Sequence, residues 1–299
     1  MKFKKSESDI PRSKQRIILT YFLVIAVALW SLFPIGNAFR ISLMSESELS
    51  AVPIHWYPHE IDLRSYGMIF GKTFEGVEYW GVSPTEMLNS VFSSLAVAVP
   101  TMIIATLIAI FAAYPLGRLK FKFKTTIFVT LLFSRILPPV ALVIPFYFIF
   151  SRIGLVGNPL GLIITYLSGI IPLATWILMG YFAQLPAEVE WAARMDGYGR
   201  FATLRRVLIP MALPGIAVVA ILSFLMAWNE FFFAFILTTG SSAATFPVML
   251  LTQVTIFAPQ NLMLAGVMLS LIPPVILALI FQRYITKLHI VDPVTVQNE

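Results

Sequence analysis

The segment Glu188–Pro210 holds the densest group of side chains that could do chemistry, and it lies between long apolar stretches. It contains the acidic residues Glu188, Glu190 and Asp196 and the arginines Arg194, Arg200, Arg205 and Arg206. It offers no Ser/His/Asp set and no pair of carboxylates in an apolar setting, so its chemistry is that of charged contacts rather than catalysis. The segment is called the charged loop below.

Two glycines, Gly197 and Gly199, divide the charged loop into two short predicted helices. Glu190 and Arg194 are four residues apart and can support one helical turn. The loop could be an amphipathic connector that lies on a membrane surface, or a docking element for a soluble partner. Gly197 favours docking, because a sharp bend there would let a short helix project from the membrane.

Two further charges, Arg135 and Glu230, fall inside apolar stretches. An arginine near the centre of a membrane helix costs at least about 2.5–3.5 kcal/mol, so we expect such residues to face a cavity or a partner. Their predicted depths differ by roughly 9 Å at 1.5 Å per residue, which makes a direct pair possible but strained. The alternatives are partners on a second chain, water in a pathway, or snorkelling of Glu230 if its helix ends early.

Other catalytic and binding chemistry is poorly supported. The chain has no cysteine, which excludes disulfides and thiolate chemistry, and its three histidines are scattered. His55 and His59 are four apart, but Pro58 argues against a helix there, so we expect no metal site. Gly71-Lys72-Thr73 resembles the end of a phosphate-binding loop, yet Tyr66 stands where that motif needs glycine. We therefore expect no nucleotide site and no bound cofactor in this chain.

The elements that hold these residues are predicted to be membrane helices. Hydrophobic residues make up 58% of the 299 residues and charged residues 12%, against roughly a quarter charged in soluble domains. Six apolar runs reach the roughly 20 residues that a bilayer requires. They are Ile17–Phe39, Met87–Leu116, Thr126–Phe150, Leu160–Phe182, Met211–Leu237 and Leu262–Ile285. The first run is too long for a cleaved signal peptide, and prolines within several runs predict kinks.

Orientation follows from the positive-inside rule. Sixteen of the 21 lysines and arginines fall on one side of the six predicted spans, while the segment between the first two spans is acid-rich. We therefore expect both termini in the cytoplasm. The predicted divisions are a cytoplasmic segment (1–16), a first span (17–39), an extracytoplasmic loop (40–86), a transmembrane domain (87–285) containing the charged loop, and a cytoplasmic tail (286–299). The net charge of +6 needs no nucleic-acid partner to explain it.

The charged loop resembles the Glu-Ala-Ala loop of the permeases of ATP-binding-cassette (ABC) importers. Ala192-Ala193, Asp196-Gly197 and Val207-Leu208-Ile209-Pro210 stand at the family's spacing, whereas Trp191 replaces its usual glutamate. Glu190, one position earlier, is a candidate to make that glutamate's polar contact. Asn89-Ser90, Ala112-Ala113-Tyr114, Gly154-Leu155 and Ala227-Trp228-Asn229-Glu230 resemble the carbohydrate branch, similar to the smaller maltose permease subunit. The resemblance covers about residues 15–290.

The resemblance implies an all-α integral membrane protein with the six-helix type I importer fold, located in a bacterial or archaeal inner membrane. It implies a permease subunit for a sugar or oligosaccharide, with an ABC ATPase dimer, a second permease subunit and an extracytoplasmic solute-binding protein as partners. ATP and Mg would bind the ATPase. The implied ATPase-coupling residues are Glu190, Ala192, Ala193, Asp196, Gly197, Arg200 and Pro210, and the expected pathway residues are Trp228, Asn229, Glu230 and Arg135.

Two roles remain open for Trp228 and Asn229. They could stack on a sugar and hydrogen-bond to it, or they could serve only in packing between helices. Rival functions are a type I permease for a non-sugar solute and a secondary transporter that uses Glu230 as its ion site. Such transporters often contain inverted repeats, and no clear repeat relates the two halves of this sequence. The sequence does not support an intramembrane enzyme, because no nucleophile is paired with a base among the apolar spans.

Overall fold

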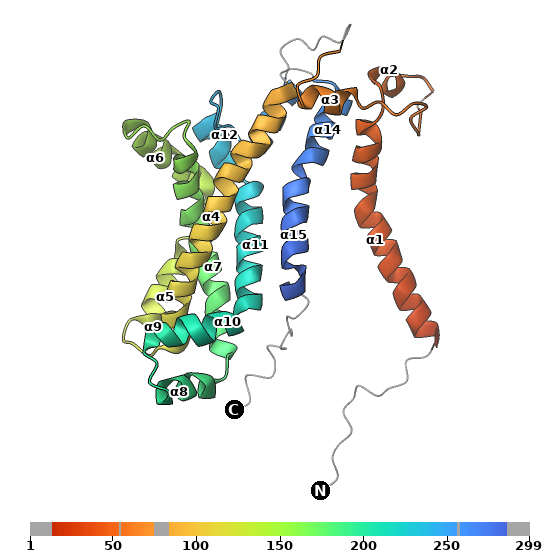
Figure 1. Ribbon diagram of the computed structural model, residues 1–299. Coiled ribbons are helices and arrows are strands. Elements are labelled where there is room, and N and C mark those ends of the chain that lie inside the picture. Colours follow the sequence, from red (N-terminus) through yellow and green to blue (C-terminus); the bar gives the residue numbers. More distant parts are fainter. Residues whose placement is uncertain (1–13, 54, 75–83, 256–257, 286–299) are drawn as a thin grey trace.

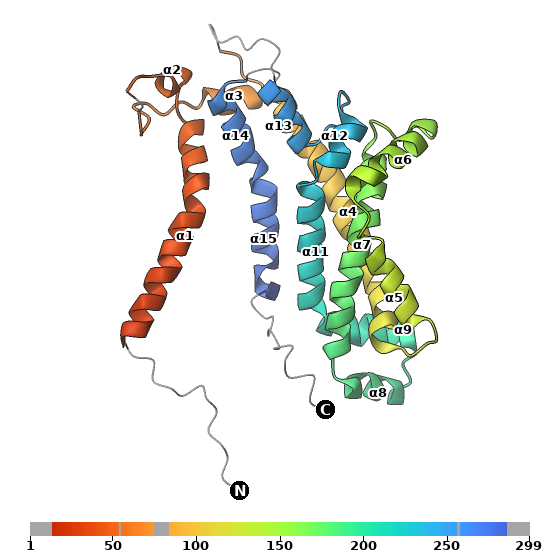
Figure 2. The same cartoon turned by 180° about the vertical axis from the view of Figure 1, so that it is seen from behind.

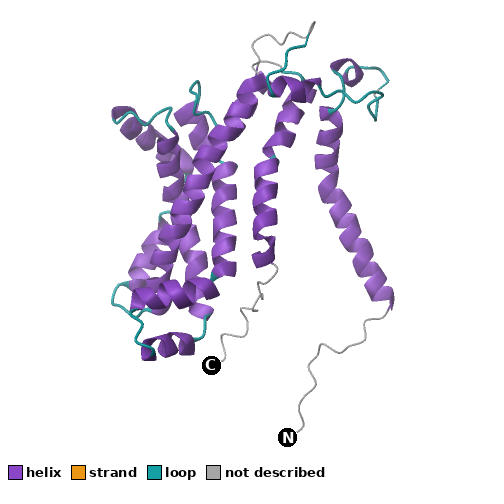
Figure 3. Cartoon of the chain, in the orientation of Figure 1, coloured by secondary structure: helices purple, strands orange, loops and turns teal. Residues whose placement is uncertain are grey.

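The computed structural model describes residues 14–53, 55–74, 84–255 and 258–285, and every regular element in these ranges is helical. Four predicted spans are confirmed as long apolar helices: α1 (Lys14–Ser42), α4 (Pro84–Arg118), α7 (Pro159–Gln184) and the consecutive α14 (Gln260–Ser270) and α15 (Ile272–Ile285). Figure 1 shows them running between two ends of the molecule, one with α8 and the other with α2 and α3. Figure 3 shows loops gathered mainly at these ends.

The predicted span Thr126–Phe150 is interrupted rather than merely kinked at its prolines. The structure has two shorter helices there, α5 (Lys124–Phe133) and α6 (Pro139–Arg152), separated by a non-helical break. Pro138 and Pro139 explain the break, because proline lacks an amide donor and disfavours helical geometry in the residue before it. Pro138 has extended backbone angles and Pro139 opens α6 in the first-turn position that tolerates proline.

The predicted span Met211–Leu237 is also interrupted. The helix α11 (Leu213–Trp228) ends before Glu230, and α12 (Phe232–Thr238) follows. Within the described ranges, four helices are long and apolar enough to cross a bilayer, and a fifth is added if Arg200–Met211 and Leu213–Trp228, which meet at 79°, count as one span. The predicted number of six spans is therefore not confirmed by helix length alone.

Shorter helices occur in the segments between the predicted spans. At the end with α2 (Glu46–Leu49) and α3 (Arg64–Ile69), α13 (Phe246–Thr255) leads toward α14. At the opposite end lie α8 (Ala187–Met195), α9 (Arg200–Thr203), a π-helical turn (Leu204–Leu208) and α10 (Ile209–Met211). These four pieces make up nearly all of the charged loop.

The core lies where α4 packs along α7 and α11. Ala98, Ala105 and Ala109 of α4 are fully buried, and such small side chains let neighbouring helices approach closely. A close backbone contact also occurs at the start of α7, with the loop that precedes it. A methyl group on Gly161 would lie 2.4 Å from the carbonyl oxygen of Leu155, which only glycine permits. The bundle is thus held by close packing of apolar helices, which is the main source of helix association inside a bilayer.

Helix α1 stands apart from this bundle. It packs against α14 near one end only, as Figures 1 and 2 both show, and its apolar window from Ile17 onward is unburied. Trp30 is 84% exposed. A helix with apolar side chains on all sides is stable in lipid or against another protein chain, but not in water.

Candidate functional site

The first candidate site is the charged loop, which begins in α8. Glu188 and Glu190 lie in the first turn of α8 and Arg194 lies in its last turn. The acidic side chains thus stand at the positive end of the helix dipole and the basic one at its negative end, which stabilises the helix. Gly197 ends the helix with φ +81°. Its amide donates to the Arg194 carbonyl at 3.0 Å and the Tyr198 amide to the Ala193 carbonyl at 3.0 Å. This is the Schellman arrangement, and it confirms the predicted bend at Gly197.

Glu190 anchors α8 to the end of α4. Its side chain is 10% exposed, and its carboxylate accepts hydrogen bonds from the Tyr114 hydroxyl at 3.0 Å and from Arg118 Nε at 3.1 Å. Arg194 Nη2 adds a third at 3.2 Å, which confirms the predicted i,i+4 pair. Arg118, 9% exposed, also donates to the carbonyls of Leu185 at 2.7 Å and Pro186 at 3.2 Å. The contact thus joins the charged loop rigidly to a helix of the core.

The other side of α8 is open and partly apolar. Trp191 is 68% exposed and Met195 87% exposed. Their helix, α8, lies beyond the end of the bundle (Figure 1). Of the remaining residues implied in coupling, Ala193 is buried; those exposed are Ala192, Asp196, Gly197, Arg200 and Pro210. The charged loop therefore presents one face to solvent while the opposite face holds it to α4.

Tyr114 and Arg118 were not expected as site residues. They lie 76 and 72 positions before Glu190, and neither a motif nor helical periodicity links them to the loop. The sequence feature that could have indicated them is Glu190 itself. A carboxylate in a short helix next to a membrane span needs a partner, and Arg118 is the basic residue in the last turn of α4.

The second candidate site is a cavity of about 510 Å³ between the α5–α6 break, α6, α7 and the α11–α12 break, called the polar cavity below. Arg135 and Glu230 both line it, as expected of intramembrane charges. Arg135 Nη1 donates to the Gly169 carbonyl at 3.3 Å. The Glu230 carboxylate accepts from the backbone amides of Phe233 at 2.9 Å and Ala234 at 3.2 Å. Among the described side chains no ion pair joins these two residues, so the direct pair that the sequence left possible but strained is not seen.

Both charges lie at helix breaks, and this explains how a membrane segment tolerates them. Glu230 caps the first turn of α12, where amides lack partners within the helix. Arg135 occupies the break between α5 and α6. The sequence-based view of two charges deep inside continuous helices is therefore corrected: each charge serves or borders an interruption and faces the same cavity.

Helix α7 contributes polar groups to this cavity that were not expected: Thr165, Tyr166 and Ser168. Tyr166 is 4% exposed, and its hydroxyl, which faces the Glu230 carboxylate, makes no hydrogen bond of normal geometry. The sequence indicated these three polar residues only weakly, because hydroxyl side chains in an apolar span usually hydrogen-bond to the backbone of their own helix. Thr165 and Ser168 do so here, to the carbonyls of Gly161 and Thr165.

Trp228 and Asn229 do not line the polar cavity. The Trp228 ring is buried and stacks on Phe224 with centroids 5.4 Å apart. Asn229 is exposed, and its amide donates to the Leu225 carbonyl at 2.9 Å. In this conformation Trp228 packs within α11 and Asn229 ends the helix, which agrees with the packing role that the sequence left open for them.

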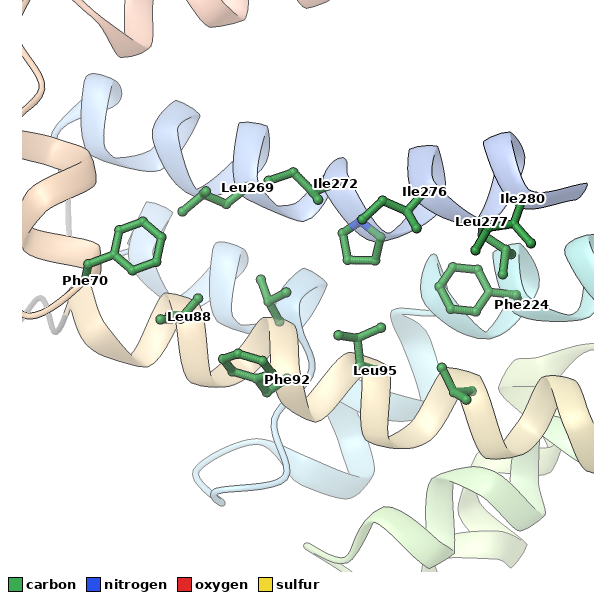
Figure 4. A pocket seen from close by; sticks show the side chains of 13 residues that line it. Phe70, Leu88, Phe92, Leu95, Phe224, Leu269, Ile272, Ile276, Leu277 and Ile280 are labelled. Carbon is green, nitrogen blue, oxygen red and sulfur yellow. The ribbon is translucent and has the colours of Figure 1, made fainter. Parts of the chain in front are cut away.

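A second cavity, of about 440 Å³, lies between α4, α11 and α14–α15. Figure 4 shows its lining, which consists of aliphatic, aromatic and proline side chains such as Phe92, Leu95, Phe224 and Ile276. None of the lining side chains can hydrogen-bond. This groove therefore suits lipid or another apolar helix and does not suit a hydroxylated solute.

Known proteins resemble this chain over most of its length. Residues 81–288 match the family described as binding-protein-dependent transport system inner membrane component. The sulfoquinovosyl glycerol transport system permease protein of Agrobacterium fabrum is 30% identical over 261 residues, covering 87% of this chain and 85% of the relative. The trehalose/maltose transport system permease protein of Thermococcus litoralis is 35% identical over 206 residues, covering 68% and 73%.

Fold comparison agrees with the sequence comparison. A chain of a bacterial ABC transporter involved in the import of the acidic polysaccharide alginate superposes with a TM-score of 0.68 and 24% identity, covering 92% of this chain and 98% of that one. The matched region contains the charged loop and the polar cavity. The chain therefore has the type I ABC permease fold and belongs to the family of binding-protein-dependent transport system inner membrane components.

Proposed function

We propose that this chain is the permease subunit of an ATP-driven importer for a sugar or oligosaccharide delivered by a solute-binding protein. The observation on which this rests is the charged loop: a short helix with an exposed apolar face on one side and a buried ionic anchor to the core on the other. The relatives named for transport of sulfoquinovosyl glycerol and of trehalose or maltose support the substrate class.

The proposed role of α8 is to transmit movement of an ATPase to the membrane helices. Trp191 and Met195 would contact the ATPase, since exposed apolar side chains rimmed by charge are typical of protein interfaces. Force on α8 would pass through Glu190 to Arg118 at the end of α4. Because α4 packs along α7 and α11, movement of its end would shift these two helices, which border the polar cavity. ATP would act by binding the outward-facing state more tightly, since a ligand shifts an equilibrium only by its differential affinity.

The polar cavity is the proposed part of the pathway in this chain. Its volume falls within the roughly 300–1,000 Å³ of small-molecule sites. Arg135 and Glu230 carry opposite charges, and the Tyr166 hydroxyl faces Glu230, so the cavity offers both donors and acceptors that a solute rich in hydroxyl groups can use. Trp228 and Asn229 keep a proposed place in the pathway only for another state of the transporter.

Orientation and assembly complete the proposal. Basic residues occur at the last turn of α4, in the α4–α5 connection and in the charged loop: Arg118, Lys120, Lys122 and the loop arginines. By the positive-inside rule this side would be cytoplasmic, and we propose the same side for both termini. The broken α5–α6 pair and the α11–α12 segment would supply the remaining two of six spans. The unpartnered α1 and the apolar groove would face lipid and a second permease subunit. ATP and Mg would bind the ATPase subunits.

Affinity purification from gently solubilised native membranes tests the assignment. We expect a nucleotide-binding ATPase to co-purify with the wild-type chain and to be lost with Met195→Asp, which changes a fully accessible side chain. Ile61→Asp is the matched control, since Ile61 is 69% exposed at the opposite end.

Reconstituted vesicles separate the importer from its rival. The importer requires ATP and a solute-binding protein for uptake. Recovery of the chain without an ATPase, together with uptake driven by an ion gradient, would instead establish a secondary transporter and overturn the proposal.

A further inference from the structure

The loop between α1 and α3 brings together three side chains that the sequence keeps apart. Glu48, His55 and His59 each offer a ligand atom, and these atoms lie within 4.8 Å of one another. Glu48 sits in α2, whose start is capped by the Ser45 hydroxyl. The two histidine rings meet edge to face with centroids 4.4 Å apart. Residues 55–59 are not helical, as Pro58 predicts, but the two histidines converge without a helix, so Pro58 does not exclude a metal site.

The spacing of the ligand atoms matches the demands of a small divalent ion. Zinc binds His nitrogen and carboxylate oxygen at about 2.0–2.2 Å in tetrahedral geometry, which sets neighbouring ligand atoms roughly 3.3–3.5 Å apart. His59 Nδ1 and Glu48 Oε1 are 3.1 Å apart already. Since no two of the three ligand atoms are more than 4.8 Å apart, each pair has to close by at most about 1.5 Å to complete the triangle, which side-chain rotation can supply.

Two unsatisfied atoms give an independent indication. Glu48 Oε2 and His55 Nδ1 are buried and have no hydrogen-bond partner. Buried polar atoms are nearly always paired, and leaving them unpaired is costly. A simple hydrogen bond between Glu48 and His59 accounts for one end of the cluster but leaves both of these atoms unsatisfied. An ion bound by Glu48 Oε2 and His55 Nδ1 would give both of these atoms a partner.

We propose that Glu48, His55 and His59 bind one divalent transition-metal ion, with zinc as the best fit and water in the fourth position. Two imidazoles and one carboxylate suit zinc and its neighbours, whereas magnesium and calcium prefer oxygen ligands alone. The ion would tie α2 to residues 55–59. Arg40 already donates to the carbonyls of His55 and Trp56, so the same residues would also be fixed to the end of α1.

Zinc binding to the purified full-length chain in detergent tests this inference and does not depend on the transport proposal. The protein is prepared with a tag that contains no histidine and is treated with a chelator. Because the chain has no cysteine and only three histidines, competing sites are few. We expect one equivalent of Zn²⁺ to bind with micromolar or tighter affinity in calorimetry. Co²⁺ should show the visible absorption of a four-coordinate site.

Variants decide whether the bound ion is at this site. His55→Gln and His59→Gln should each weaken Zn²⁺ binding at least tenfold, and millimolar Mg²⁺ should not compete. His289→Gln, which changes the remaining histidine outside the described residues, is the control and should bind like wild type. His59 is 68% exposed in its side chain, so its variant should fold, and size-exclusion and circular dichroism profiles check this. Failure of the wild type to bind, or equal binding by all three variants, would overturn the proposal.

Discussion

Replacing Glu190 with Gln should release α8 from the end of α4. The glutamine keeps the size of the side chain but removes the charge that Arg118 and Arg194 share, and its amide would place donors against donors. Removing one partner of a buried ion pair costs about 3–5 kcal/mol. Arg118 keeps its bonds to the carbonyls of Leu185 and Pro186, which places the expected cost at the lower limit, about 3 kcal/mol.

Hydrogen exchange measures this loss directly. A cost of about 3 kcal/mol corresponds to an increase of somewhat more than 100-fold in the local opening of α8, since 1.4 kcal/mol is a factor of ten. We expect the amides of α8 to exchange faster by up to that factor in Glu190→Gln, while those in the middle of α11 stay unchanged. Transport by the reconstituted importer should fall in parallel, although the chain still inserts in the membrane.

Two variants on the same helix provide the controls. Glu188→Gln makes the same chemical change at an exposed position and removes only the interaction with the helix dipole, about 0.3–1 kcal/mol, so α8 should exchange at most about fivefold faster. Arg194→Gln removes a pair whose arginine is 50% exposed, which is worth about 0.3–0.5 kcal/mol. If Glu190→Gln exchanges no faster than Glu188→Gln, the contact with Arg118 does not anchor α8, and the proposed route of force into α4 is wrong.

Four further outcomes follow from particular contacts. Gly197→Ala should destabilise the end of α8 by about 1–2 kcal/mol because of its positive φ, whereas Gly199→Ala should not; equal exchange in both would contradict the Schellman ending. Gly161→Ala should lower the melting temperature in detergent at a cost of about 1–3 kcal/mol, while Gly180→Ala on the same helix, with open space around it, should be neutral or stabilising. Glu230→Ala should expose the first amides of α12 at a cost of about 0.5–2 kcal/mol, and Glu230→Gln, which keeps one acceptor, should cost less; similar exchange of α12 in both variants and wild type would rule out the cap. Tyr166→Phe should leave stability unchanged or higher and raise the KM for solute; a clear loss of stability would mean that the hydroxyl already has a partner.

Features that depend on neighbours along the chain were predictable. The long apolar runs predicted α1, α4 and α7 within a few residues, because crossing a bilayer requires only enough consecutive apolar side chains. The Glu190–Arg194 pair and the bend at Gly197 follow equally from helical spacing and from glycine's tolerance of positive φ. Pro138 and Pro139 were recognised as a kink, but the break they cause is larger than a kink, since α5 and α6 are separate helices.

The sites themselves required the tertiary structure. Glu190 meets Tyr114 and Arg118 from more than 70 residues away, and that meeting depends on which faces of α4 and α7 pack together. Arg135 and Glu230 share one cavity without pairing, because each lies at a break whose extent local sequence does not specify. His55 and His59 approach each other along a non-helical path that no periodic pattern describes. Local spacing thus determined the long unbroken helices and the end of α8, whereas long-range packing decided which polar groups face one another.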